Sequence, residues 1–417
     1  MFTCLRGNIV HAPAFGALEA VERGWLVLED GVIRGVFAQL PQEYAGGEVI
    51  DYGDCLIMQS FADLHLHAAQ YPMLGLGMDL QLLDWLHTYT FFNESRFADT
   101  DFARRTYRQF AQKLIENGTT RVAAFSSRHT DATLILMEEL ERAGVTGFVG
   151  KVNMDRDSGV AQETTEESKS ETLRWLDACH FEHVKPMLTP RFVPSCTDEL
   201  LAWLGRVAAE RNMPVQSHLS ENDKEIALVA QLCPDCEQYW QVYDKAGLWR
   251  KGTIMAHCIY SDQREQQAMI DAGVTMVHCA NSNVNVLSGT ASVREMIENG
   301  VHVALGSDIA GGDQLEMYRV IVNSIRASKI KEMETGKSFL TVPEGYYLGT
   351  TAGHRYFGSG AGFAPGDKLH AIVVDDSSMP EPARPLTLAE RLERAIYLME
   401  KDNIRTVWSE GRCVVNK

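Results

Sequence analysis

Residues 59–68 read Gln-Ser-Phe-Ala-Asp-Leu-His-Leu-His-Ala, an apolar run that ends in two histidines one residue apart. Side chains at positions i and i+2 of a β-strand point to the same side of the strand. We therefore expect the imidazoles of His65 and His67 to converge on one point, with Leu64 and Leu66 turned the other way. Two neutral imidazoles beside a common centre are typical zinc ligands. Alone, the pair also fits two unrelated histidines on a solvated strand face. Whether the pair binds a metal therefore depends on further ligands elsewhere in the chain.

Downstream of this stretch, strand-like apolar runs alternate with amphipathic helical segments. Eight such strands with intervening helices predict an α/β fold, a (β/α)₈ TIM barrel. Positions 59 to 312 span 254 residues, near the roughly 250 typical of that barrel. A doubly wound open sheet is the alternative, but no Gly-x-Gly-x-x-Gly follows the first strand. We expect strands at 57–65, 119–126, 146–152, 184–189, 214–218, 252–257, 274–278 and 302–306, and helices at 101–116, 132–143, 168–177, 198–211, 263–272, 291–298 and 317–333.

Both ends of the chain are rich in short strands and turns. Asp30-Gly31 lies between two apolar runs, which predicts a β-hairpin. The tail carries a strand from residue 369, a helix at 388–401 and a second hairpin. We therefore expect a small β-sandwich domain assembled from 1–58 and 362–417, beside a barrel catalytic domain at 59–361.

The overall composition limits the classes of partner. A net charge of −17 opposes binding to a nucleic acid backbone or an anionic membrane. No apolar run approaches the roughly 20 residues that cross a bilayer, and the N-terminus lacks a secretory signal pattern. The nine scattered cysteines do not resemble a disulfide framework. We therefore expect a reduced, cytoplasmic protein that binds neither membrane nor nucleic acid.

Polar side chains lie where several of the expected barrel strands end. Active sites of such barrels are built at the carboxyl ends of the strands, so these groups share one mouth. Asp308 has the strand parity of Ala304 and Gly306, which turns it inward, although a helix cap is the alternative role for it. Glu221 comes three residues after a histidine and could hang over a metal without binding it, or be a solvated loop carboxylate. The strand-end groups are His65, His67, His218, His257, His278 and Asp308, and together they predict a metal site.

Longer stretches around these residues resemble the guanine deaminases of the amidohydrolase superfamily. The similarity covers the whole barrel and, more loosely, both ends of the chain. His-x-His alone marks the superfamily, whereas the Gln70-Tyr71 stretch, Pro-Arg-Phe and Ser-His-Leu-Ser-Glu-Asn together mark guanine deaminases. The matching stretches begin at His65 (His-Leu-His-Ala-Ala-Gln-Tyr-Pro), Gly147 (Gly-Phe-Val-Gly-Lys-Val-Asn-Met-Asp), Glu163 (Glu-Thr-Thr-Glu-Glu-Ser), Thr189 (Thr-Pro-Arg-Phe), Gln216 (Gln-Ser-His-Leu-Ser-Glu-Asn) and Gly306 (Gly-Ser-Asp-Ile-Ala-Gly-Gly).

The resemblance implies a TIM barrel of the metal-dependent hydrolase type, a homodimer with one Zn²⁺ per subunit, and hydrolysis of guanine at C2 to xanthine and ammonia. The catalytic residues that the resemblance implies are Glu221, Asp308 and His257. Glu221 would protonate the ring nitrogen beside C2 and then move a proton to the departing amine, while Asp308 takes a proton from water. His257 is either a zinc ligand or a donor to the attacking oxygen, and both remain open. The implied zinc ligands are His65, His67, His218, His257 and Asp308.

The same resemblance implies a purine-binding set. An arginine fork matches the O6/N7 edge of guanine, so Arg191 would aim C2 at the metal. Phe192 would stack on or wall the purine, and Gln70 would donate or accept at its edge. Departures from the family pattern at Gln59-Ser60, Cys258, Ala280 and Ser307 remove no functional group. The implied purine-binding residues are Gln70, Arg191, Phe192, His218, Glu221 and Asp308.

Four alternatives remain beside this interpretation. The substrate could be another amino-heterocycle, such as 8-oxoguanine, a pterin or an aminotriazine, or the chain could be a non-catalytic purine-binding or scaffold protein. His180-Phe-Glu182 and Cys233-Pro-Asp-Cys236 imitate a different class of zinc deaminase, but their spacing is wide. A dinuclear hydrolase needs a lysine near the end of the fourth strand, and Lys185 lies at its start. One metal is therefore expected.

Overall fold

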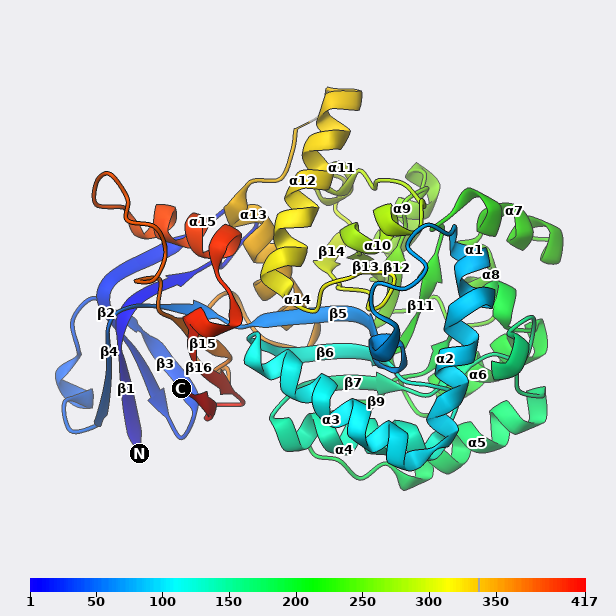
Figure 1. The fold of residues 1–417 in the computed structure, drawn as a ribbon, viewed down its shortest axis with the longest axis horizontal. Coiled ribbons are helices and arrows are strands. Elements are labelled where there is room, and N and C mark those ends of the chain that lie inside the picture. The colour runs from blue at the N-terminus through cyan, green and yellow to red at the C-terminus, as the bar shows by residue number, and fades with distance from the viewer. Residues whose placement is uncertain (337) are drawn as a thin grey trace.

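The middle of the chain forms an eight-stranded parallel barrel in the computed structural model, which describes residues 1–336 and 338–417 (Figure 1). Two four-stranded sheets, β5-β6-β7-β9 and β11-β12-β13-β14, make its wall. They join at both edges, because Leu188 bridges Val215 and the Asp308 N–H donates to His65 O (2.8 Å). This confirms the expected barrel. Its strands are β5 Phe61–His67, β6 Thr119–Phe125, β7 Thr146–Gly150, β9 Val184–Pro186, β11 Val215–Leu219, β12 Thr253–His257, β13 Thr275–His278 and β14 His302–Leu305.

Helices follow most of these strands and cover the outside of the barrel (Figure 1). Side-chain caps explain where several of them begin. Helix α5 starts three residues before the expected position because Thr164 and Glu167 form a capping box. The outer helices are α3 Thr100–Glu116, α4 Thr130–Ala143, α5 Thr165–Ala178, α6 Asp198–Glu210, α7 Asp223–Leu232, α8 Trp240–Lys245, α9 Gln263–Ala272, α10 Ala280–Asn285, α11 Val293–Glu298 and α12 Met317–Thr335.

The first barrel strand differs from its expected range. Ile57 and Met58 belong to strand β4 (Glu48–Gln59), where they pair with β1 of the terminal sheet. The chain changes hydrogen-bond partner at Ser60, whose N–H donates to His370 O. Strand β5 then runs two residues further than expected, to His67, so both histidines lie on the strand.

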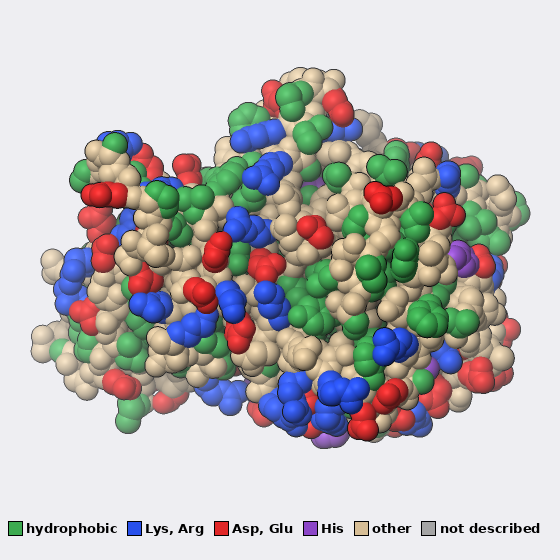
Figure 2. All heavy atoms as spheres, in the orientation of Figure 1, with side chains coloured by type: hydrophobic (Ala, Val, Ile, Leu, Met, Phe, Trp, Pro, Cys, Tyr) green, Lys and Arg blue, Asp and Glu red, His purple; other side chains and the backbone are tan. Residues whose placement is uncertain are grey.

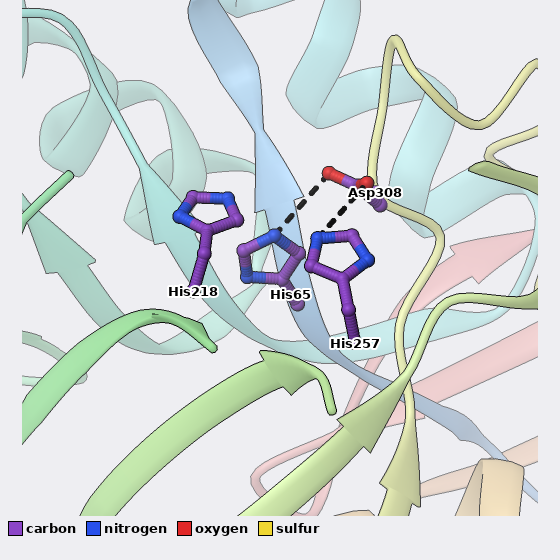
Figure 3. A group of neighbouring side chains, drawn as sticks. All are labelled: His65, His218, His257 and Asp308. Carbon is purple, nitrogen blue, oxygen red and sulfur yellow. Dashed lines mark ion pairs between the residues drawn. The ribbon is translucent and has the colours of Figure 1, made fainter. Parts of the chain in front are cut away.

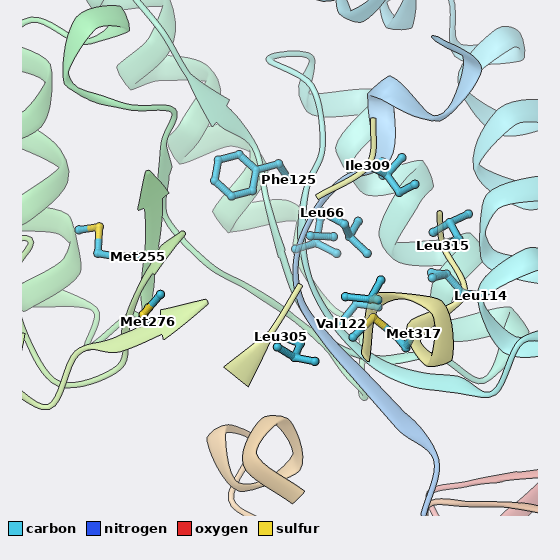
Figure 4. Packing of buried hydrophobic residues seen from close by; sticks show 14 of the residues in the cluster. Leu66, Leu114, Val122, Phe125, Met255, Met276, Leu305, Ile309, Leu315 and Met317 are labelled. Atoms are coloured by element: carbon cyan, nitrogen blue, oxygen red, sulfur yellow. The ribbon is translucent and has the colours of Figure 1, made fainter. Parts of the chain in front are cut away.

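The side chains along β5 do not alternate regularly. The Asp63 carboxylate accepts from the backbone N–H groups of His65 and Ser307, and the pairing register with β6 shifts between Asp63 and Leu66. Leu66 packs in the layer between the strands and the helices, as expected (Figure 4). The expectation for Leu64 is wrong, because Leu64 joins a cluster inside the barrel with residues from β6, β12, β13 and β14. The irregularity turns both imidazoles inward.

The two ends of the chain combine in one seven-stranded sheet beside the barrel (Figure 1). Asp30 and Gly31 both have positive φ, which matches the expected two-residue hairpin between β2 and β3. Leu5, Ile57 and Trp408 pack in a hydrophobic core that this sheet encloses. The boundaries at 58/59 and 361/362 stay a prediction. The sheet has the order β17-β16-β15-β4-β1-β2-β3, with β1 Phe2–His11, β2 Glu19–Glu29, β3 Val32–Phe37, β15 Ala371–Val374, β16 Ile404–Ser409 and β17 Arg412–Asn416.

A buried polar network joins the terminal sheet to the barrel. His370 Nδ1 and the Thr120 hydroxyl lie 2.9 Å apart, and His370 Nε2 donates to the Glu410 carboxylate (3.0 Å). Arg121 pairs with the same carboxylate at 3.4 Å. Burial lowers the pKa of His370 to about 4, so the ring is neutral at pH 7. The interface therefore depends on an uncharged histidine.

Figure 2 shows acidic and basic side chains interspersed over one face of the molecule. Within the described residues, no helix combines the length and the apolar character that crossing a bilayer requires.

Candidate active site

The first half of the site comes from β5. His65 Nε2 lies 3.2 Å from Asp308 Oδ1, and His67 Nε2 lies 3.4 Å from the same oxygen (Figure 3 shows His65 and Asp308). Asp308 follows β14, the strand that closes the barrel against β5. The predicted inward turn of Asp308 is thus borne out by the geometry, and the residue does not serve as a helix cap.

The other two histidines end β11 and β12 and have fixed tautomers. His218 Nδ1 donates to Arg191 O (2.6 Å), and His257 Nδ1 donates to Asn283 Oδ1 (2.8 Å). Since the acceptors are oxygens, Nδ1 carries the proton, and the tautomer with a single N–H keeps its lone pair on Nε2. Such outer partners orient metal-binding histidines in proteins. Both lone pairs are available for a cation.

These groups form a donor set that fits one metal ion. One ligand atom from each of His65, His218, His257 and Asp308 can be chosen so that all four lie within 4.8 Å of one another (Figure 3). The His65 ring is completely buried, yet within the described residues neither of its nitrogens makes a hydrogen bond. His67 adjoins the set, with its Nε2 3.1 Å from His218 Nε2. Three nitrogens and a carboxylate oxygen suit Zn²⁺, so the residues present fit the implied metal.

Burial sets the charges of these groups. Desolvation lowers the pKa of His65, His67 and His218, which keeps the rings neutral and able to act as ligands. Burial by itself would raise the pKa of Asp308, but the surrounding imidazoles hold it well below its ordinary value. The site therefore favours an ionised Asp308 carboxylate and weak proton binding at the rings of His65, His67 and His218.

Glu221 adjoins this group at His257. It follows β11, and its Oε2 is 3.3 Å from His257 Nε2, while Ser288 Oγ donates to Oε1 (3.1 Å). Its backbone N–H donates to Glu225 Oε2 (3.0 Å), which fixes the loop. Burial, with the nearby charge of Asp308, raises the pKa of Glu221 to about 8. A carboxyl group of this kind is protonated at neutral pH and can donate a proton.

Most of the predicted site residues border one cavity of about 390 Å³ that opens to solvent. Gln70 lies on the 3₁₀ turn Ala68–Met73 that follows β5. Arg191 and Phe192 follow the two-residue strand β10 (Thr189–Pro190). His65 contacts the other ligands below the cavity. The predicted residues that line the cavity are His67, Gln70, Arg191, Phe192, His218, Glu221, His257 and Asp308.

The structure adds residues that the sequence patterns did not single out. Asn283 orients His257, Ser288 contacts Glu221, and Glu94 contacts both Gln70 and Arg191. Helix α1 (Leu82–Trp85) also contributes an apolar wall to the cavity. Asn283 follows a strand-end motif and could have been considered, whereas Glu94 sits in no recognisable pattern.

Two of the stretches that carry the resemblance lie outside the cavity and have structural roles. Lys151 and Glu163 form a completely buried ion pair at 2.7 Å. Asp155 accepts hydrogen bonds from the hydroxyls of Thr165 and Thr197, at 2.7 and 2.6 Å. These contacts brace the loops that follow β7 and β10, next to Arg191.

The alternative metal arrangements find no support. Among the residues described, the candidate metal groups include neither Cys233 nor Cys236. Glu182 falls instead in a partly exposed group with Glu141 and His183. Lys185 is exposed, and its ammonium donates to Phe181 O. The geometry therefore favours one metal at the barrel mouth.

Comparisons with known proteins agree with this geometry. A model of the amidohydrolase family matches residues 56–414. The guanine deaminase of Mus musculus is 35% identical over 374 aligned positions, covering 86% of this chain and 82% of that protein. The guanine deaminase of Dictyostelium discoideum is 33% identical, covering 97% of this chain and 96% of that protein. A crystal structure of guanine deaminase from C. acetobutylicum with bound guanine has a TM-score of 0.96 at 39% identity, covering 99% of this chain and 100% of that chain.

Proposed function

Since the chain belongs to the amidohydrolase family, we propose that it is a zinc-dependent guanine deaminase that converts guanine and water to xanthine and ammonia. One observation carries the proposal: a single cavity is bordered by His218, His257 and Asp308 of the metal-binding set, by Glu221, and by Gln70 and Arg191. The similar C. acetobutylicum protein, a guanine deaminase, binds guanine in its active site.

The proposed metal ligands are His65, His67, His218, His257 and Asp308. A Zn²⁺ ion held there would activate water as the nucleophile at neutral pH. Asn283 accepts the Nδ1–H of His257, so the tautomer with a single N–H presents the Nε2 lone pair to the site. This favours a ligand over a hydrogen-bond donor, which are the two roles left open for His257.

Glu221 and Asp308 divide the proton transfers. Asp308, ionised among the histidines, accepts the proton that the attacking water loses. Glu221, protonated because it is buried, donates to the ring nitrogen beside C2 and later helps to protonate the departing amine. Their separate environments give the two carboxyl groups opposite protonation states at the same pH.

Gln70, Arg191 and Phe192 are the proposed purine-binding residues. The guanidinium of Arg191 donates to the O6/N7 edge, which turns C2 toward the metal ligands. The Phe192 ring lies 6.2 Å from the His218 ring, centroid to centroid, and walls the cavity beside the ligands. The apolar side chains of Leu82, Trp85 and Leu86 face the same space.

The activity is tested with the zinc-loaded protein. We expect xanthine and ammonia to form from guanine, with a higher kcat/KM than for 8-oxoguanine, a pterin or an aminotriazine under the same conditions. Faster ammonia release from one of these other heterocycles would contradict the choice of substrate. The variant Glu221→Gln, measured for zinc content alongside, distinguishes a catalytic defect from a lost metal.

We also propose a cytoplasmic homodimer with one Zn²⁺ per subunit. The resemblance to the guanine deaminase family supports the dimer and the single metal, and the cysteine usage supports the reducing compartment. Metal analysis of the purified chain should give one zinc per polypeptide, and sedimentation equilibrium should give twice the monomer mass. A value of two metals per chain, or a monomer at micromolar concentration, would contradict these expectations.

A further inference from the structure

Glu94 joins the two polar purine-binding side chains. It lies on helix α2 (Phe91–Ser95) and is 1% exposed. Gln70 Nε2 donates to its Oε1 at 2.8 Å, and Arg191 Nη1 donates to its Oε2 at 2.7 Å. Each carboxylate oxygen thus holds one of the two groups that border the cavity.

These contacts fix the direction of the Gln70 amide. Gln70 Oε1 accepts from the Ala310 backbone N–H at 3.0 Å, while Nε2 donates to Glu94. A backbone N–H cannot accept and a carboxylate cannot donate, so the amide cannot flip. One lone pair of Oε1 is taken by Ala310, and Nε2 keeps one N–H for a ligand.

Arg191 is held equally firmly. Its backbone N–H donates to Asn153 O, and its carbonyl accepts from His218 Nδ1. One guanidinium N–H is donated to Glu94, which leaves four of its five donors. The guanidinium carbon also lies 5.3 Å from the centre of the Phe91 ring, on the same helix as Glu94.

We propose that Glu94 is a positioning residue that orients the hydrogen-bond donors of Gln70 and Arg191 along this side of the cavity, and that it thereby selects purines with acceptor atoms at positions 6 and 7. The inference rests on the proposed guanine deaminase activity. Guanine offers O6 and N7 as acceptors at this edge. A purine with hydrogen at position 6 leaves a buried hydrogen-bond donor of the site without a partner. A purine with an amino group at position 6 places its own N–H donor against that donor. Both mismatches lower kcat/KM strongly in a site built to form hydrogen bonds.

The variant Glu94→Gln breaks this arrangement without changing the size of the side chain. A carboxamide has one acceptor oxygen, but two donors face it, so its NH₂ group must oppose either Gln70 or Arg191. The buried guanidinium also loses its carboxylate partner. The orientations of the Gln70 amide and the Arg191 guanidinium beside the cavity are then no longer fixed.

The test compares guanine with 2-aminopurine and 2,6-diaminopurine, which carry the same 2-amino group but lack O6. Ammonia release is measured for the wild-type and Glu94→Gln holoenzymes. We expect the ratio of kcat/KM for guanine to that for each analogue to fall about tenfold or more in the variant. The reduction for guanine should appear mainly in KM, because Glu94 does not touch the metal ligands.

Four further proteins make the result decisive: two single-variant controls, and Gln70→Ala with and without Glu94→Gln. Asn93→Ala, on the same helix, removes only a hydrogen bond to Tyr89 O and should leave the ratio unchanged. Glu94→Asp keeps the charge with a shorter reach and should fall between the wild type and Glu94→Gln; it also serves if Glu94→Gln fails to fold. In Gln70→Ala, adding Glu94→Gln should lower the ratio less than it does in the wild type.

An equal loss of activity toward all three purines, or an unchanged ratio in a folded variant, would overturn the inference and leave the guanine deaminase activity intact. Absence of guanine turnover by the wild-type protein would instead overturn the proposed function, and the inference would fall with it.

Discussion

His218 Nε2 lies 3.1 Å from His67 Nε2, and the two rings stack at an interplanar angle of 14°. His218 gives its only ring proton to Arg191 O, so a lone pair faces His67. Close by, the ionised Asp308 carboxylate is also buried. The arrangement collects electron pairs at one point of the barrel mouth, and a cation there compensates them.

Removal of the metal should therefore destabilise the protein. We expect chelation to lower the thermal unfolding midpoint by several degrees and added Zn²⁺ to restore it, because the ion binds the folded chain. Differential scanning calorimetry measures both. His67→Ala should abolish most of the response, whereas His180→Ala, at an exposed ring far from the site in sequence, should keep it. An identical midpoint with and without metal would contradict the site.

Glu221→Gln should retain zinc but lose about 10²–10⁴-fold in kcat, since the amide cannot donate an acidic proton. Ser288→Ala removes only the hydroxyl that donates to Glu221, so its loss should be smaller, about tenfold or less. Steady-state kinetics with parallel metal analysis separates the two. Full activity in Glu221→Gln would refute its role.

Asn283→Ala should weaken zinc binding about 10–100-fold, because it frees the His257 ring that Asn283 orients. Asn283→Asp keeps an acceptor at this position and should recover most of the affinity. Competition with a chromophoric chelator measures the dissociation constant. Asn281→Ala is the matched control: its amide contacts Asp313 instead, and zinc affinity should stay unchanged.

The buried His370 should make the protein sensitive to acid. Burial lowers its pKa from 6.5 to about 4. At a pH between these two values, the His370 ring is protonated in the unfolded chain and neutral in the folded chain. Stability from this group is fully present above pH 6.5 and is lost as the pH falls toward 4. Between pH 7 and pH 5 the loss is up to about 2 kcal/mol at 1.36 kcal/mol per pKa unit.

Urea unfolding of the zinc-saturated protein at pH 7 and pH 5 tests this. His370→Gln should show a smaller drop in unfolding free energy between the two pH values than the wild type. His180→Gln, at an exposed ring, should show the same drop as the wild type. Since all three chains share the metal site, the difference between them isolates His370. An equal drop in all three would contradict the prediction.

Periodicity in the sequence was sufficient to locate all eight barrel strands and most helices, because hydrophobic alternation is a local property. It failed at Leu64, where the Asp63 side chain inserts into the backbone ladder and shifts the register. Periodicity also predicted one continuous strand at 146–152, whereas the structure has β7 and a separate β8 (Val152–Asn153), with the buried Lys151 between them. Side chains that interrupt the pairing depend on distant partners, which local spacing does not record.

The site likewise contains residues that the sequence predicts and residues that it does not. His65, His67, His218, His257 and Asp308 lie at or just beyond the carboxyl ends of barrel strands, so barrel topology brings them together. Glu94 could not be found, because its burial depends on how a short helical segment folds back over the mouth. That segment includes the π-helical turn Leu86–Thr90, and its position is set by tertiary packing.

The contact that closes the barrel, Asp308 N–H to His65 O, joins the first and last strands of the wall and lies within the ligand set itself. Asp308 therefore both closes the ring through its backbone and completes the metal site through its side chain. A nascent chain that ends before β14 already contains the four histidines of the ligand set but lacks the Asp308 carboxylate. The full ligand set therefore exists only once nearly three quarters of the polypeptide, up to Asp308 of 417 residues, has been made.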